Sequence, residues 1–176
     1  MKLLTQKRVL ALNVRPHSFA FVVFDGPSEL VDWGIKSFRH GVNAVKVPMS
    51  TKMALVLDQC RPDVVVLNEA MKGAPNTTIV MSVKLAKNRR IPVRRISRDD
   101  VRKMFPRSNS NKYQIATVVA ARFQELLPRL GLRRKVWEAE KYSMGIFEAA
   151  ALGITYFTRG ATTDNDNDRT LSTLPR

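Results

Sequence analysis

One short segment constrains the fold of this chain more than any other. Residues 63–68 (DVVVLN) form an uninterrupted apolar run that follows Arg61-Pro62 and leads directly into Glu69. Consecutive apolar residues between turn signals are typical of a strand that is buried on both faces, as in a parallel sheet covered by helices. The segment therefore predicts an α/β domain, because an open antiparallel sheet would show alternating polar residues.

The rest of the chain supplies the remaining elements of such a domain. Three apolar runs at the beginning are separated by short turns and predict an antiparallel meander over residues 8–14, 19–24 and 29–38. A further short strand is expected at residues 91–96. The expected fold class is α/β, with a mixed five-stranded sheet of three antiparallel strands and then parallel strands, and with helices on both faces.

Spacings of three and four between apolar residues predict the helices. They cover residues 42–60, 76–87, 111–127 and 141–157, with Pro48 as a kink or a late start in the first of them and Ser97 as the N-cap of another helix. The 176 residues fit one domain, which we place at residues 1–158. Residues 159–176 show no usable periodicity and are expected to form a disordered tail.

The charge balance indicates the kind of partner. The chain has 30 Lys and Arg against 15 Asp and Glu, a formal net charge of +15. Such a surplus favours a polyanion such as nucleic acid, although basic residues that only aid solubility are an alternative. Eleven basic residues crowd residues 84–112, and only Asp99 and Asp100 oppose them there. We expect Arg15, Lys72 and the basic residues of this segment to contact phosphates. The basic residues of the segment are Lys84, Lys87, Arg89, Arg90, Arg94, Arg95, Arg98, Arg102, Lys103, Arg107 and Lys112.

Several classes of function are disfavoured by what the sequence lacks. The one cysteine, Cys60, cannot form an internal disulfide or a cysteine-based zinc cluster. The glycine-rich loops that cradle nucleotide phosphates are absent. No uncharged apolar stretch approaches the length of a membrane span, and the first residues do not resemble a signal peptide, so we expect a cytoplasmic protein without a membrane partner.

Four segments together resemble the RuvC-type Holliday-junction resolvases of the ribonuclease H-like superfamily. Residues 9–38 resemble the first hairpins of that family, and residues 63–70 (DVVVLNEA) resemble its strand that ends in a catalytic Glu. Residues 112–116 (KYQIA) resemble the Lys-x-Gln-x-Ala sequence that begins its next long helix, and residues 144–153 (MGIFEAAALG) its terminal, acid-bearing helix. The similarity spans residues 8–157 in a shared order and spacing.

The resemblance implies a catalytic site but also shows where this chain departs from it. In that family four acids hold two divalent metal ions that hydrolyse a phosphodiester. Glu69 matches the strand-end Glu, and Glu148 stands where the last helix carries an Asp. The first-strand Asp corresponds to Asn13, whose amide is uncharged, and the other helix acid falls near Gly145. Glu138 or Glu140 could take the place of a missing acid, but we interpret them as surface residues that precede the last helix.

The resemblance thus predicts a set of site residues and leaves the activity open. The expected metal ligands for Mg²⁺ or Mn²⁺ are Asn13, Glu69 and Glu148, and Lys112 joins them as a catalytic residue. The first hypothesis is a metal-dependent endonuclease that acts on branched or structured DNA, and family resemblance suggests a homodimer. The alternatives are a catalytically inactive nucleic-acid-binding protein and a basic structural subunit of a nucleoprotein assembly.

Overall fold

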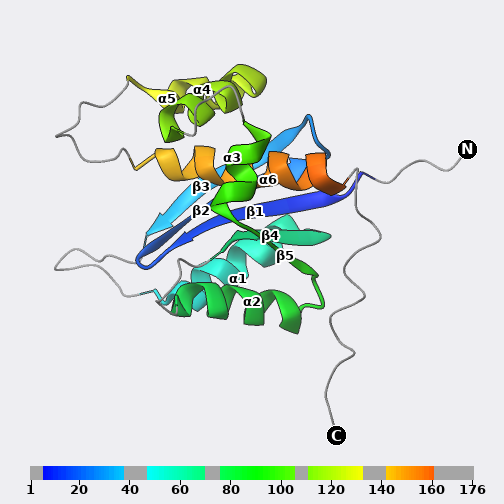
Figure 1. The fold of residues 1–176 in the computed structure, drawn as a ribbon. Coiled ribbons are helices and arrows are strands. Elements are labelled where there is room, and N and C mark those ends of the chain that lie inside the picture. The colour runs from blue at the N-terminus through cyan, green and yellow to red at the C-terminus, as the bar shows by residue number, and fades with distance from the viewer. Residues whose placement is uncertain (1–5, 38–46, 70–75, 106–110, 133–141, 161–176) are drawn as a thin grey trace, which may run out of the picture.

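A five-stranded sheet forms the centre of the protein (Figure 1). The computed structural model describes residues 6–37, 47–69, 76–105, 111–132 and 142–160. The strands are β1 (Arg8–Arg15), β2 (Ser18–Asp25), β3 (Leu30–Ser37), β4 (Val64–Asn68) and β5 (Val93–Ile96), and their order across the sheet is β3-β2-β1-β4-β5. The first three strands pair antiparallel, whereas β4 runs parallel to both β1 and β5. This arrangement confirms the predicted fold class.

The pleat of β1 divides the core into two layers. Val9 and Ala11 pack into one buried cluster, and Leu10, Leu12 and Val14 pack into the other, because successive side chains of a strand point to opposite faces. Asn13 continues the first series and is buried at 7% exposure. It therefore faces the same side of the sheet as Val9 and Ala11.

Helices cover both faces of the sheet (Figure 1). Helices α1 (Met49–Cys60) and α2 (Thr77–Asn88) contribute to the cluster that contains Leu10 and Leu12. Helices α4 (Lys112–Arg122) and α6 (Met144–Gly160) contribute to the cluster that contains Val9, and α3 (Arg98–Met104) packs on the same side through Val101 and Met104. Asn13 thus faces α6, which is the condition for a site between β1 and the last helix.

Local capping explains where several helices begin. Helix α1 starts at Met49 with Pro48 as its N-cap, so the proline marks a late start and not a kink. Asn76 caps α2 by accepting hydrogen bonds from the backbone amides of Thr78 and Ile79. Ser97 caps α3 as predicted, and the pair formed with Asp100 is a capping box.

The prediction of one helix over residues 111–127 is wrong. Helix α4 ends at Arg122, Phe123 leaves the helical conformation at φ −122° and ψ 89°, and a short 3₁₀ turn, η2 (Gln124–Leu126), leads into α5 (Leu127–Leu130). Pro128 has no amide hydrogen to donate to the carbonyl one turn earlier, so a continuous helix is disfavoured there. Phe123 instead turns into the core, where its ring lies 5.7 Å from that of Phe24.

The last helix of the described chain is α6, which runs to Gly160. The domain boundary at residue 158 stays a prediction, because residues 161–176 of the expected tail lie outside the described residues. None of the helices in the described ranges has the length and apolar character needed to cross a membrane.

An ion pair at the start of β1 ties the strand to its neighbours and gives a testable prediction. Arg8 donates to both carboxylate oxygens of Asp25 at 2.6 Å, and this hydrogen bonding lowers the pKa of Asp25 below its ordinary value of 3.8. A carboxyl group whose pKa is lowered in the folded state stabilises the fold at pH values above its ordinary pKa. This contribution is lost as the pH falls through the lowered pKa. We expect Arg8→Met to reduce the free energy of unfolding by about 1 kcal/mol at pH 7. Urea titrations at pH 7 and in acid should show the difference shrinking below pH 3.8, whereas a difference that is independent of pH would contradict this role.

Candidate nucleic-acid interface

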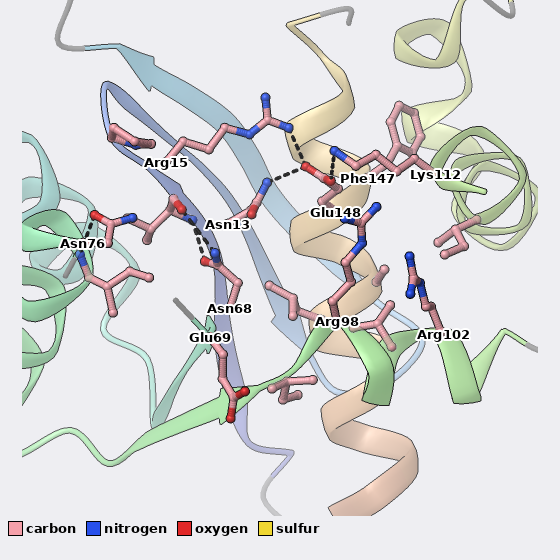
Figure 2. Close-up of a pocket in the computed structure, with 18 of the residues that line it drawn as sticks. Asn13, Arg15, Asn68, Glu69, Asn76, Arg98, Arg102, Lys112, Phe147 and Glu148 are labelled. Atoms are coloured by element: carbon pink, nitrogen blue, oxygen red, sulfur yellow. Dashed lines mark hydrogen bonds and ion pairs between the residues drawn. The ribbon is translucent and has the colours of Figure 1, made fainter. Parts of the chain in front are cut away.

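A pocket of about 620 Å³ opens at the carboxyl ends of the parallel strands (Figure 2). Its walls come from the ends of β1 and β4, from the first residues of α2, and from α3, α4 and α6. Open α/β sheets bind ligands at this edge because the loops and helix starts that follow the strands surround it. All four predicted catalytic residues, Asn13, Glu69, Lys112 and Glu148, line this one pocket.

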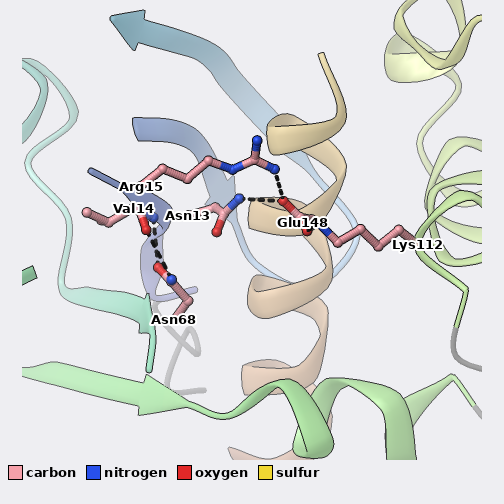
Figure 3. Close-up of polar contacts among 6 residues, drawn as sticks. All are labelled: Asn13, Val14, Arg15, Asn68, Lys112 and Glu148. Carbon is pink, nitrogen blue, oxygen red and sulfur yellow. Dashed lines mark hydrogen bonds and ion pairs between the residues drawn. The ribbon is translucent and has the colours of Figure 1, made fainter. Parts of the chain in front are cut away.

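Glu148 is the centre of the polar cluster in the pocket (Figure 3). Its Oε2 accepts a hydrogen bond from Asn13 Nδ2 at 2.7 Å and from Arg15 Nη2 at 2.5 Å. Its Oε1 lies 2.8 Å from Lys112 Nζ. Because the Glu148 side chain is only 26% exposed, these three donors replace most of the water that a free carboxylate would bind. We call Asn13, Arg15, Lys112 and Glu148 the Glu148 cluster.

Gly145 lies beside Asn13, one turn before Glu148 on α6. A Cβ built on Gly145 would be 3.9 Å from Asn13 Nδ2 and 3.1 Å from the Cβ of Ala20. A side chain at position 145 would therefore project into the neighbourhood of Asn13, where the resemblance places an acid. The structure brings the two substituted positions together and shows that neither carries a charge.

Glu69 lines the pocket but does not join the Glu148 cluster. It is exposed, its backbone amide donates to the carbonyl of Ile96, and Figure 2 shows its carboxylate directed away from Asn13 and Glu148. Within the ranges that the structure describes, no three His, Cys, Asp or Glu side chains are grouped as metal ligands. Glu138 and Glu140 lie outside these ranges.

The donors around Glu148 do not fit a pair of divalent metal ions. Metal ligation needs carboxylate or carbonyl oxygens that point to a common centre, and like charges tolerate that proximity only with cations between them. Here the cations beside Glu148 belong to Arg15 and Lys112, and the Asn13 amide turns its NH₂ group toward the carboxylate. The Asn13 amide donates a hydrogen bond to the carboxylate oxygen, and, unlike an Asp, it carries no negative charge that would attract a metal ion.

Asn68 is a structural residue of the site that the sequence analysis missed. The regular pairing of β1 with β4 reaches Leu12 and Leu67, and beyond it the Asn68 side chain takes over. Its Oδ1 accepts from the Val14 amide at 2.7 Å, and its Nδ2 donates to the Val14 carbonyl at 3.2 Å (Figure 3). This pair holds the end of β1 that carries Arg15. The signal was present in the sequence, because Asn68 is the polar residue at which the apolar run stops.

Two arginines of the basic segment reach the pocket from α3. Figure 2 shows the Arg98 and Arg102 side chains extending toward the side that holds Glu148 and Lys112. Arg98 forms no ion pair with any residue in the described part of the chain, and Arg102 has only Asp99 at 3.5 Å. Among described residues, Arg102 Nε is also the one buried side-chain nitrogen or oxygen without a hydrogen-bond partner. A buried donor without a partner is costly, so an acceptor supplied by a ligand would stabilise it.

Other basic residues of the segment lie outside the pocket. Lys84 and Lys87 lie on α2, Arg94 and Arg95 on the edge strand β5, and Lys103 on α3, so the positive charge continues around the β5 edge onto both faces of the sheet. Arg89 pairs with Asp58 through two hydrogen bonds, and Arg90 follows at the end of α2 with φ 57°. Lys72 and Arg107 lie outside the described residues.

Solved structures similar to this chain identify its fold. No protein-family model matches the sequence, and no curated protein is similar enough to be detected. Solved structures of RuvC from Thermus thermophilus are similar, one of them in complex with a Holliday junction substrate, with 16% identity over 88% of this chain and 95% of theirs and TM-scores of 0.61 for the complex and 0.59 without DNA. The Holliday junction resolvase of fowlpox virus is similar at 16% identity over 86% of this chain and 98% of its own, with a TM-score of 0.52. This chain therefore has the ribonuclease H-like fold of the RuvC-type resolvases.

Proposed function

We propose that this protein binds structured nucleic acid through the pocket and the β5 edge, and that it does so without hydrolysing the phosphodiester by a pair of metal ions. The observation that carries the proposal is the Glu148 cluster, in which Arg15, Lys112 and Asn13 all contact the carboxylate of Glu148 on α6. Among the hypotheses from sequence, these contacts favour the catalytically inactive nucleic-acid-binding protein.

The charge distribution supports nucleic acid as the partner. Four cations line the pocket, Arg15, Arg98, Arg102 and Lys112, against the two acids Glu69 and Glu148. The four cations outnumber the two acids, so the pocket as a whole attracts anions. Guanidinium groups bind phosphate oxygens in pairs, and the net charge of +15 adds a long-range attraction to a polyanion. Structural neighbours that act on four-way junctions make branched DNA the substrate to test first.

The endonuclease hypothesis needs ligands that the described site does not bring together. A water molecule becomes a nucleophile at neutral pH when a metal ion lowers its pKa, and the metal needs several oxygen ligands at one centre. Of the expected ligands, Asn13 donates to Glu148, and Glu69 is directed elsewhere. Mg²⁺ or Mn²⁺ at Asn13, Glu69 and Glu148, and a homodimer with two such sites, stay predictions from resemblance.

Binding is tested with a fluorescent four-way junction and a duplex of equal length. Fluorescence anisotropy in EDTA, over a series of salt concentrations, gives the affinity and its salt dependence. We expect binding without divalent metal and a steep fall in affinity with salt, because each neutralised phosphate releases counterions. No binding at low salt would overturn the proposal, and equal binding of both DNAs would favour the basic structural subunit.

Removing the two α3 arginines should weaken binding more than removing an equal charge elsewhere. We expect Arg98→Gln and Arg102→Gln each to lower the affinity for the junction by about tenfold and to reduce the salt slope by about one. Arg129→Gln on α5 is the matched control, since Arg129 is exposed and does not line the pocket. Equal losses from all three variants would show that the pocket has no special part in binding.

A further inference from the structure

The pocket has an apolar floor that phosphate binding does not explain. Five buried apolar side chains from the core layer beneath α3, α4 and α6 form it, on β5, α4 and α6: Ile96, Ile115, Phe147, Ala151 and Leu152. Val14 and Ile79 line the pocket from the opposite core layer. A groove that only follows a sugar-phosphate backbone needs cations and polar groups, and apolar surface beneath them adds nothing to such contacts. The floor therefore indicates a ligand group that is itself largely apolar.

We infer that this pocket receives one unpaired nucleotide of a bound strand, with its base on the apolar floor and its phosphate beside Arg98 and Arg102. The inference rests on the proposed function and specifies what the same site recognises. Every base has a flat apolar face that stacks on or packs against apolar side chains, and every nucleotide joins that face to a phosphate a short distance away. The pocket offers both environments side by side.

The cations in the pocket distinguish a nucleotide from an uncharged apolar ligand. Glu148 is paired with Arg15 and Lys112, and Figure 2 shows Arg98 and Arg102 reaching the pocket from α3. Arg102 Nε lacks an acceptor among the described residues. A phosphate oxygen is the acceptor for which arginine is best suited, since its planar group forms two parallel hydrogen bonds. Charge complementarity thus selects an anionic ligand.

The size and enclosure of the pocket favour a single base that has left its helix. A volume of about 620 Å³ is within the range of about 300–1,000 Å³ that small-molecule sites occupy, so one nucleotide fits and a base pair with its neighbours does not. Proteins that enclose a base must extrude it from the stack, and the cost is least where the base is already unpaired. Bulges and branch points supply such bases. Asn76 and Glu69, at the rim, carry groups that can bond to a base edge.

The test compares a DNA duplex that has one bulged 2-aminopurine with the same duplex fully paired, both bound by the full chain in EDTA. We expect the bulged duplex to bind about tenfold more tightly, as one base contact contributes. The 2-aminopurine emission should rise on binding as the base leaves its neighbours. Free dAMP should compete only at concentrations far above those of the duplex.

Two tryptophan variants of α2 separate the pocket from the rest of the surface. Thr77 is exposed and lines the pocket, so Thr77→Trp should fill it and lower the affinity for the bulged duplex to that for the paired duplex. Val80, on the same helix, is 60% exposed and does not line the pocket, so Val80→Trp should keep the preference. Arg98→Gln gives a second variant of the pocket that does not add bulk.

The outcomes separate this inference from the proposed function. If bulged and paired duplexes bind equally, or Thr77→Trp keeps the preference, the nucleotide pocket is wrong while nucleic-acid binding stands. If dAMP displaces the bulged duplex at micromolar concentration, the pocket is a site for free nucleotides and the inference is also overturned. If neither duplex binds, the proposed function fails as well.

Discussion

Replacing Asn13 with aspartate should destabilise the protein by about 2 kcal/mol at neutral pH and should not create a nuclease. Asn13 is 7% exposed, and its Nδ2 lies 2.7 Å from Glu148 Oε2. Asn13→Asp replaces this donor with a carboxylate oxygen at the same position. Two carboxylates then face each other at a largely buried site, and Arg15 and Lys112 must neutralise both.

The pH dependence identifies the cause of this loss. A carboxyl group beside another carboxylate has a raised pKa. Its cost to stability is fully present at pH values above that raised pKa and disappears as the pH falls below the ordinary pKa of an Asp carboxyl. Urea titrations of wild type and Asn13→Asp at pH 7 and pH 4 should show the gap narrowing in acid. Asn13→Ala is the control, because it removes the donor without adding charge. We expect it to lose less stability than Asn13→Asp, and its difference from the wild type should not shrink between pH 7 and pH 4.

Asn13→Asp should still lack nuclease activity because it restores only one of the missing groups. Gly145 continues to offer no side chain beside position 13, and Glu69 is directed away from it. If Asn13→Asp were instead more stable in Mn²⁺ than the wild type and nicked a four-way junction, the site would be a metal centre that lacks one carboxylate, and our account of the Glu148 cluster would be wrong.

The second large effect is expected at Gly153, in the middle of α6. A Cβ at this position would overlap Cε2 of the Phe24 ring, so the ring would have to move. The Phe24 ring has little room to do so, because Phe123 and Phe157 each pack against it with ring centres 5.7 Å apart. We expect Gly153→Ala to lower the free energy of unfolding by about 2–3 kcal/mol, as overpacking of a closed core does.

A second glycine of the same helix provides the control. A Cβ added at Gly160 would have no atom within 4 Å, so Gly160→Ala should leave stability unchanged or raise it slightly through helix propensity. Thermal unfolding of the two variants under one condition gives the comparison. Equal stability of Gly153→Ala and Gly160→Ala would show that α6 does not approach the Phe24 ring of β2 closely enough to exclude a methyl group.

The sheet could be predicted from sequence because its signals are local. The uninterrupted run before Glu69 indicated a buried parallel strand, and the structure pairs it with both β1 and β5. The break after Arg122 was missed because Ile115, Val119, Phe123 and Leu126 keep helical spacing while the chain itself leaves the helix at Phe123. Spacing reports which side chains are buried, and a turn that keeps the same residues buried gives the same pattern.

The sequence indicated that several candidate residues would lie at one edge of the sheet, but not which contacts they would make. Asn13, Lys112 and Glu148 meet as expected, because the carboxyl end of β1 and the starts of α4 and α6 lie at one edge of the sheet. Glu148 pairs with Arg15 and Lys112, which are far from it in the sequence. No local sequence pattern reports the distances between such residues. The direction of the Glu69 side chain likewise depends on the tertiary fold.

If protein cations, and not metal ions, neutralise Glu148, an end-labelled four-way junction should stay intact in Mg²⁺ or Mn²⁺. We expect a stable complex with the junction and no cleavage product above that of a metal-free control. Paired, symmetric nicks that vanish in Glu69→Gln and in Glu148→Gln would contradict this expectation, because they would show both carboxylates acting in one hydrolytic centre.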